Sequence, residues 1–94
     1  MADADATALS ARINGRVQGV GFRMQTRSRA LRLGLTGWVR NEPDGSVRVE
    51  AEGPADAIES FRRWLETGPP GAWVTNVDAQ TGPAEGRFNR FTIR

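Results

Sequence analysis

Residues 9–23 read LSARINGRVQGVGFR, and this stretch contains a strand pattern, then a glycine-rich segment, then the start of a helix pattern. Apolar side chains at positions 9, 11 and 13 alternate with polar ones, which is the period of a strand with one buried face. Three glycines follow, Gly15, Gly19 and Gly21, and a helical period begins at Phe22. The stretch therefore predicts a strand that is connected to a helix by a glycine-rich loop.

The predicted helix covers residues 22–34. Phe22, Thr26, Ala30 and Leu33 fall on one face of such a helix, which is the face expected to pack on the core. Gly34 suits the position just after a helix end, where the backbone often turns left-handed.

A hairpin is predicted next, with strands at 35–41 and 46–52. Pro43, Asp44 and Gly45 between them are turn residues. In the second of these strands, apolar residues alternate with charged ones. We expect one face to be solvated, and the side chains expected there are Arg12, Arg48, Glu50 and Glu52.

A second helix is expected to begin with Pro54 at its first position. Ile58, Phe61 and Leu65 form its apolar stripe, and residues 68–71, GPPG, end it. Two strands are predicted after this loop. Val74 and Val77 mark the first, and their uneven spacing suits a bulge; Phe88, Phe91 and Ile93 mark the closing strand.

The predicted order is β-α-β-β-α-β, with an additional C-terminal strand left open. This order is typical of the ferredoxin-like α+β sandwich, in which two helices cover one face of a mainly antiparallel sheet. Ninety-four residues suffice for one domain. We expect a disordered tail at 1–7 and the folded domain at 8–94.

Composition excludes several chemistries. The chain has no Cys and no His, and all 13 of its basic residues are Arg, against 11 acidic residues. Imidazole catalysis, thiolate zinc sites and lysine Schiff bases are therefore excluded. No signal-peptide pattern and no apolar run of membrane-spanning length is present, so we expect a cytoplasmic protein that binds no membrane.

The loop from Gly15 to Arg23 has the features of an anion site. A strand-to-helix junction presents unpaired backbone N–H groups and the positive end of the helix dipole, and Arg23 lies at the start of the helix. The loop matches neither the nucleotide-binding P-loop nor the dinucleotide pattern. From these residues alone, a tight turn with a solvated arginine fits equally well.

The sequence also resembles the acylphosphatase family in two separated blocks. The first is GRVQGVGFR at 15–23, and the second is GLTGWVRN at 34–41, followed by DGSV at 44–47. The spacing between the blocks, the GPPG loop at 68–71 and the ending FTI at 91–93 are similar as well. The resemblance covers residues 9 to 94.

The resemblance implies an acylphosphatase, an acid-anhydride hydrolase that splits small acyl phosphates into carboxylate and phosphate by in-line attack of water, without metal or cofactor. It implies that Arg23 binds the phosphoryl group and that Asn41 orients the water. It also implies that loop residues hold the phosphate: Gly15, Arg16, Val17, Gln18, Gly19, Val20, Gly21 and Phe22. Considered without this resemblance, Asn41 directly precedes Glu42 and Pro43, and asparagine at such a position also suits a turn.

Met24 and Gln25 after Arg23, and Trp73, depart mildly from the family pattern and leave substrate preference open. We expect a monomer. One alternative is an RNA-binding module of the same topology, but that class needs aromatic side chains on the open sheet face, and residues 46–52 contain none. The other alternative is a non-catalytic domain of the same fold.

Overall fold

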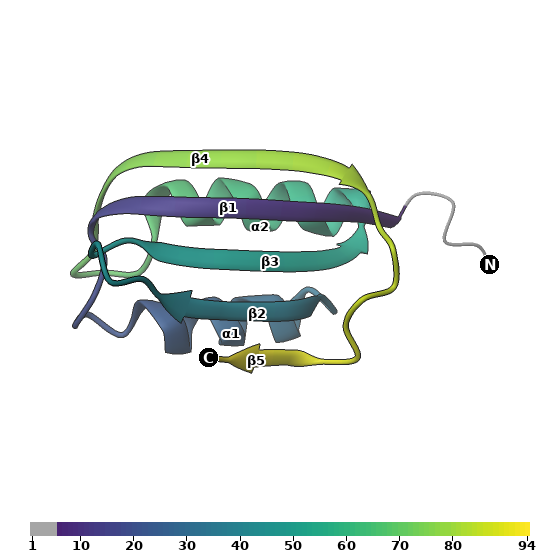
Figure 1. Cartoon of the computed structure of the whole chain (residues 1–94), viewed down its shortest axis with the longest axis horizontal. Helices are drawn as coiled ribbons and strands as arrows, with labels where there is room; N and C mark the ends of the chain where they lie inside the picture. Colours follow the sequence, from purple (N-terminus) through teal and green to yellow (C-terminus); the bar gives the residue numbers. More distant parts are fainter. Residues whose placement is uncertain (1–5) are drawn as a thin grey trace.

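The computed structural model describes residues 6–94, which form one five-stranded sheet with both helices on the same face (Figure 1). The strand order is β4-β1-β3-β2-β5; within the described residues, the β2–β5 ladder is parallel, and the β1–β3, β1–β4 and β2–β3 ladders are antiparallel. The ferredoxin-like sandwich and the additional strand are therefore confirmed. The elements are β1 Ala6–Arg16, α1 Phe22–Arg32, β2 Thr36–Asn41, β3 Val47–Pro54, α2 Ala55–Thr67, β4 Trp73–Pro83 and β5 Phe91–Ile93.

The first strand begins earlier than its alternating pattern indicates. Ala6 pairs with Pro54, and Thr7 pairs with both Gly53 and Pro83. The prediction of a tail at 1–7 was therefore wrong for these two residues, and positions 1–5 lie outside the described part of the chain. Pairing with two neighbouring strands, rather than local pattern, extends β1.

The core lies between the sheet and the helices, as predicted from the two-residue period of the strands and the 3.6-residue period of the helices. Leu9 and Ile13 of β1 and Val49 of β3 are fully buried, and so are Phe61 and Leu65 of α2. On α1 the buried side chains are Phe22, Thr26 and Ala30. The predicted helix faces are therefore confirmed, and burial of these apolar surfaces is the main stabilising contribution.

The helix ends differ slightly from those predicted. α1 ends at Arg32, where the Gly34 amide donates to Leu31 O at 3.1 Å and the Leu35 amide donates to Ala30 O at 2.9 Å. These two bonds satisfy the last carbonyls of the helix and reverse the chain. Pro54 is the N-cap of α2 rather than its first helical residue. Neither helix within residues 6–94 is long and apolar enough to span a membrane.

The expectation that Glu50 and Glu52 lie on a solvated face was wrong. Their exposed fractions are only 7% and 5%. The segment after β4 crosses this face, and Arg87 from it contacts Glu52 at 2.9 Å and Glu50 at 3.4 Å. Ser10 on β1 also donates to Glu50 at 2.5 Å. Period-2 alternation identifies which face a side chain occupies but not whether another segment covers that face.

Glu52 anchors the crossing segment through its backbone. Its carboxylate accepts the amides of Glu85, Gly86 and Arg87 at 3.2, 2.9 and 3.2 Å, besides the Arg87 guanidinium. Burial by itself raises the pKa of Glu52, but the hydrogen bond from Arg87 and those from the three amides outweigh it and hold that pKa below its usual value. This anchor directs the chain to the edge of β2, where β5 pairs (Figure 1).

Glu52→Gln is expected to lower the free energy of unfolding by about 1–3 kcal/mol at pH 7, because a charged acceptor is removed from a buried site. A carboxyl with a lowered pKa contributes stability above its unfolded pKa and loses it as the pH falls through its folded pKa. The difference in the free energy of unfolding between wild type and variant should therefore shrink as the pH falls below the usual glutamate pKa of 4.5.

Thermal unfolding at pH 7 and at pH 3 measures this difference. Glu85→Gln is the matched control, since Glu85 lies in the same segment with its side chain exposed. A difference that is the same at both pH values would contradict the assigned role of the Glu52 charge.

Candidate active site

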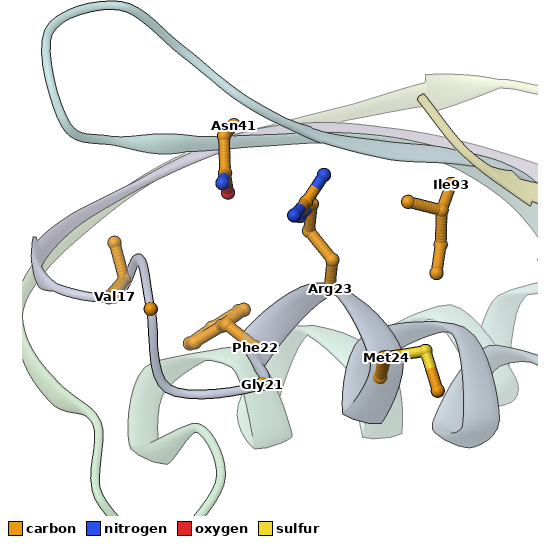
Figure 2. A pocket seen from close by; sticks show the side chains of 8 residues that line it. Val17, Gly21, Phe22, Arg23, Met24, Asn41 and Ile93 are labelled. Atoms are coloured by element: carbon orange, nitrogen blue, oxygen red, sulfur yellow. The ribbon is translucent and has the colours of Figure 1, made fainter.

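A cleft of about 220 Å³ lies where the loop after β1, the first turn of α1, the end of β2 and β5 meet. Figure 2 shows Arg23 rising from α1 and Asn41 descending from β2 into the same space. Among residues 6–94, one cationic side chain and no carboxylate line the cleft. Its lining residues are Val17, Gly19, Gly21, Phe22, Arg23, Met24, Asn41 and Ile93.

The backbone of the loop supplies amide donors at the helix start. Gly19 and Gly21 both have φ +76°, a left-handed conformation that glycine adopts without the strain of a side chain. Gly21 is the N-cap of α1 and offers no side-chain acceptor, and the first turn contains no acidic residue. The first intrahelical bond is that from the Gln25 amide to Gly21 O. The amides of 22–24 therefore have no helical acceptor and lie at the positive end of the helix dipole.

Gly15 lies at an irregularity of the sheet near the end of β1, just before the loop. The pairing of β1 with β4 shifts register between Asn14 and Gly15, so the bulge predicted near Val74 and Val77 is confirmed. Gly15 has φ +127°, and a Cβ there would lie 2.1 Å from the carbonyl oxygen of Trp73. No other residue type fits this close approach of two backbones, so glycine is required where the strand turns into the loop.

Gln18 connects the loop to the hairpin that carries Asn41. Its side-chain Nε2 donates to Glu42 O at 2.8 Å and to Ser46 O at 2.9 Å. Glu42 and Ser46 also close the turn between β2 and β3, through the Glu42 amide donating to Ser46 O at 2.8 Å. Gln18 therefore holds the loop and the Asn41 strand in one fixed relative position.

Gln18→Met keeps the length of the side chain but removes both donors. We expect acyl-phosphate kcat/KM to fall about 10-fold, since two hydrogen bonds of ordinary strength are lost. Gln80→Met is the matched control, because Gln80 is exposed on β4 and does not line the cleft. A kcat/KM within twofold of wild type in Gln18→Met would show that the loop holds its shape without this contact.

Arg23 has no counter-ion in the part of the chain that the structure describes. Among residues 6–94, its guanidinium forms no hydrogen bond or ion pair, whereas Arg62 bonds Glu59 and Glu66, and Arg87 bonds Glu50 and Glu52. An unpaired guanidinium beside unpaired amides favours an anion, and its planar fork suits two phosphate oxygens.

Asn41 ends β2 as a half-buried residue, with its side-chain amide directed into the cleft (Figure 2). Within the described residues this amide has no hydrogen-bond partner in the protein. It offers both a donor and an acceptor, and a water molecule is a ligand for which such a pair is suited.

The structure brings together six of the ten residues proposed from the sequence. Gly15, Arg16, Gln18 and Val20 do not line the cleft: the first two pair with β4, and Gln18 contacts the hairpin. Two lining residues, Met24 and Ile93, were not predicted. The position of Met24 next to Arg23 was a usable signal, but nothing local to Ile93 places it there.

Comparison with known proteins gives one consistent result. The family model described as Acylphosphatase matches residues 9–93. A relative from Salinibacter ruber named acylphosphatase is 58% identical over 92% of this chain and 90% of its own length. The crystal structure of acylphosphatase from Bacillus subtilis is similar, with a TM-score of 0.89 and 36% identity, and covers 94% of this chain and 98% of that one.

The same fold also occurs inside a longer protein. Full-length HypF is similar over 95% of this chain with a TM-score of 0.80 and 27% identity, but only 12% of the HypF chain is covered. The relative from Salinibacter ruber, in contrast, is matched over almost its whole length.

Proposed function

The chain belongs to the acylphosphatase family and is an acylphosphatase, a hydrolase of acyl phosphates, and we propose that the cleft between the 15–22 loop and Asn41 carries this reaction. In the proposed arrangement, Arg23 and the amides of the loop bind the phosphoryl group, and Asn41 holds the attacking water. The observation that carries the proposal concerns the described residues, 6–94: an unpaired guanidinium, unpaired helix amides and a free side-chain amide meet in one cleft that no carboxylate of these residues lines.

The reaction needs little from the protein besides position and charge. Phosphoryl transfer passes through a loose transition state with charge on the equatorial oxygens. The water oxygen forms a bond to phosphorus while the bond from phosphorus to the acyl oxygen breaks, and the carboxylate leaves with that bond's electron pair. The proton from water passes to a phosphate oxygen. This scheme suits a chain with no His, Cys or Lys.

Charge stabilisation in this scheme comes from Arg23 and the amides of the loop. Donors that are already oriented toward the developing charge lower the barrier without reorganising during the reaction. Gln18 and the fixed bulge at Gly15 keep these donors in place. On this basis we propose that turnover requires neither metal nor cofactor.

Hydrolysis of benzoyl phosphate tests the proposal directly, with phosphate release as the readout. We expect turnover that is inhibited by inorganic phosphate and retained after exhaustive EDTA treatment. Folded protein that releases no phosphate would support the non-catalytic alternative. Activity that disappears with EDTA and returns with a divalent cation would overturn the metal-free scheme.

We also propose that the protein acts on small acyl phosphates as a cytoplasmic monomer, without nucleic acid. On the open sheet face, Trp38 is 9% exposed, and the guanidiniums of Arg40 and Arg94 each lie 4.8 Å from its ring centre. The ring is thus not available to stack a base. Light scattering and a salt-dependent RNA-binding assay test these statements.

A further inference from the structure

Two apolar side chains line the cleft on the side of Arg23 away from Val17 (Figure 2). Met24 is 67% exposed and Ile93 is 36% exposed. Among the described residues, four large hydrophobic side chains are exposed, the other two being Leu31 and Trp73. Two of these four exposed large apolar side chains thus gather at one cleft, where a ligand could cover them.

The two residues are far apart in sequence, and both are held in place. Met24 lies in the first turn of α1, and Ile93 pairs with Val39 in the parallel ladder between β5 and β2. The Arg94 amide donates to Val39 O at 2.8 Å, and Arg27 Nε donates to Phe91 O at 3.3 Å. β5 is therefore fastened both to the strand that carries Asn41 and to the helix that carries Arg23.

The cleft has a polar part and an apolar part, and an acyl phosphate is divided in the same way. The loop amides, Arg23 and Asn41 bind oxygen atoms, whereas Met24 and Ile93 offer only carbon and a thioether sulfur. Ligand sites commonly combine a few polar groups that orient the ligand with apolar walls that bury the rest. Once the phosphoryl group occupies the polar part, the remaining apolar surface faces the rest of the substrate.

We propose that Met24 and Ile93 form the acyl-group subsite and favour substrates with bulky apolar acyl groups over small or charged ones. This inference rests on the proposed function of the cleft. An apolar acyl group gains by leaving water against these side chains, while a charged acyl group loses hydration there without a partner. The chemical step is the same for both kinds of substrate, so the effect lies in their relative kcat/KM.

The test compares benzoyl phosphate with acetyl phosphate in wild type and in Met24→Gln. Glutamine keeps the length and helix propensity of methionine but replaces its apolar end with an amide. We expect the ratio of kcat/KM for benzoyl over acetyl phosphate to fall about 3–10-fold, the order expected when roughly one buried methylene contact is lost. Ile93→Thr, which keeps a β-branched side chain in β5, should lower the ratio in the same direction. Leu31→Gln is the control, because Leu31 is exposed on the same helix outside the cleft.

The inhibition constant of inorganic phosphate separates a subsite from a structural effect, since phosphate occupies only the polar part. Support for the subsite is a lowered substrate ratio together with a phosphate inhibition constant like that of wild type. The inference is overturned if the ratio of kcat/KM for benzoyl over acetyl phosphate is unchanged in both variants, or if kcat/KM falls equally for both substrates. The proposed function stands in either case. Wild-type protein that hydrolyses neither substrate overturns the proposed function itself.

Discussion

Arg23→Gln is expected to abolish measurable phosphate binding and to reduce acyl-phosphate turnover by ~10³-fold or more, as for other arginines that stabilise a transferring phosphoryl group. Glutamine keeps a hydrogen-bonding side chain but has no charge and no planar fork of donors. The loop amides remain, so the loss measures what the guanidinium alone contributes. Steady-state kinetics with benzoyl phosphate and inhibition by inorganic phosphate provide both readouts.

The fold should survive this change, because the Arg23 side chain is exposed and forms no ion pair or hydrogen bond with residues 6–94. Arg32→Gln is the matched control on the same helix, since Arg32 is also exposed and does not line the cleft. It should retain activity. Inhibition by phosphate that persists in the Arg23→Gln variant would count against the assigned role.

Asn41→Ala is expected to lower kcat by ~10²-fold or more while leaving the inhibition constant of phosphate nearly unchanged, judged from the loss of one oriented transition-state contact. The reason for this split is that the proposed ligand of Asn41 is the attacking water and not the phosphoryl group. The side-chain amide has no protein partner in the described structure, so its removal breaks no structural bond. Kinetics over a range of substrate concentrations separates kcat from KM.

Asn89→Ala serves as the control, since Asn89 is an exposed asparagine outside the cleft. If Asn41→Ala instead raises KM and keeps kcat, Asn41 binds substrate in the ground state. If both substrate and phosphate binding weaken together with thermal stability, Asn41 is a structural residue of the hairpin.

The fold could be predicted from the sequence because its elements have local signatures. The alternation of Leu9, Ala11 and Ile13 identified β1, and the stripe of Ile58, Phe61 and Leu65 identified α2; the structure buries all six. These patterns come from the two-residue period of a strand and the 3.6-residue period of a helix. Strand and helix boundaries differed by a few residues, since pairing between distant strands extends β1 to Ala6.

The proposed site was predictable only in its contiguous part. The 15–22 loop and Arg23 are neighbours in sequence, so a strand-to-helix junction with glycines pointed to an anion site. Asn41 entered through the resemblance to a family, since its residue type at a hairpin also suits a turn. Ile93 had no local signal, because β5 reaches the cleft only by pairing with β2.

The sequence by itself determined the order of helices and strands, the buried face of β1 and of both helices, and the loop whose glycines permit a left-handed backbone. All of these depend on residues a few positions apart. Only the tertiary structure decided that Glu50 and Glu52 are buried, that Gln18 joins the loop to the hairpin, and that Ile93 completes the cleft. Each of these three depends on contacts between segments far apart in sequence; Glu52 and Arg87, for example, are 35 positions apart. No local pattern encodes such contacts, because the segments that make them are neighbours only in the folded structure.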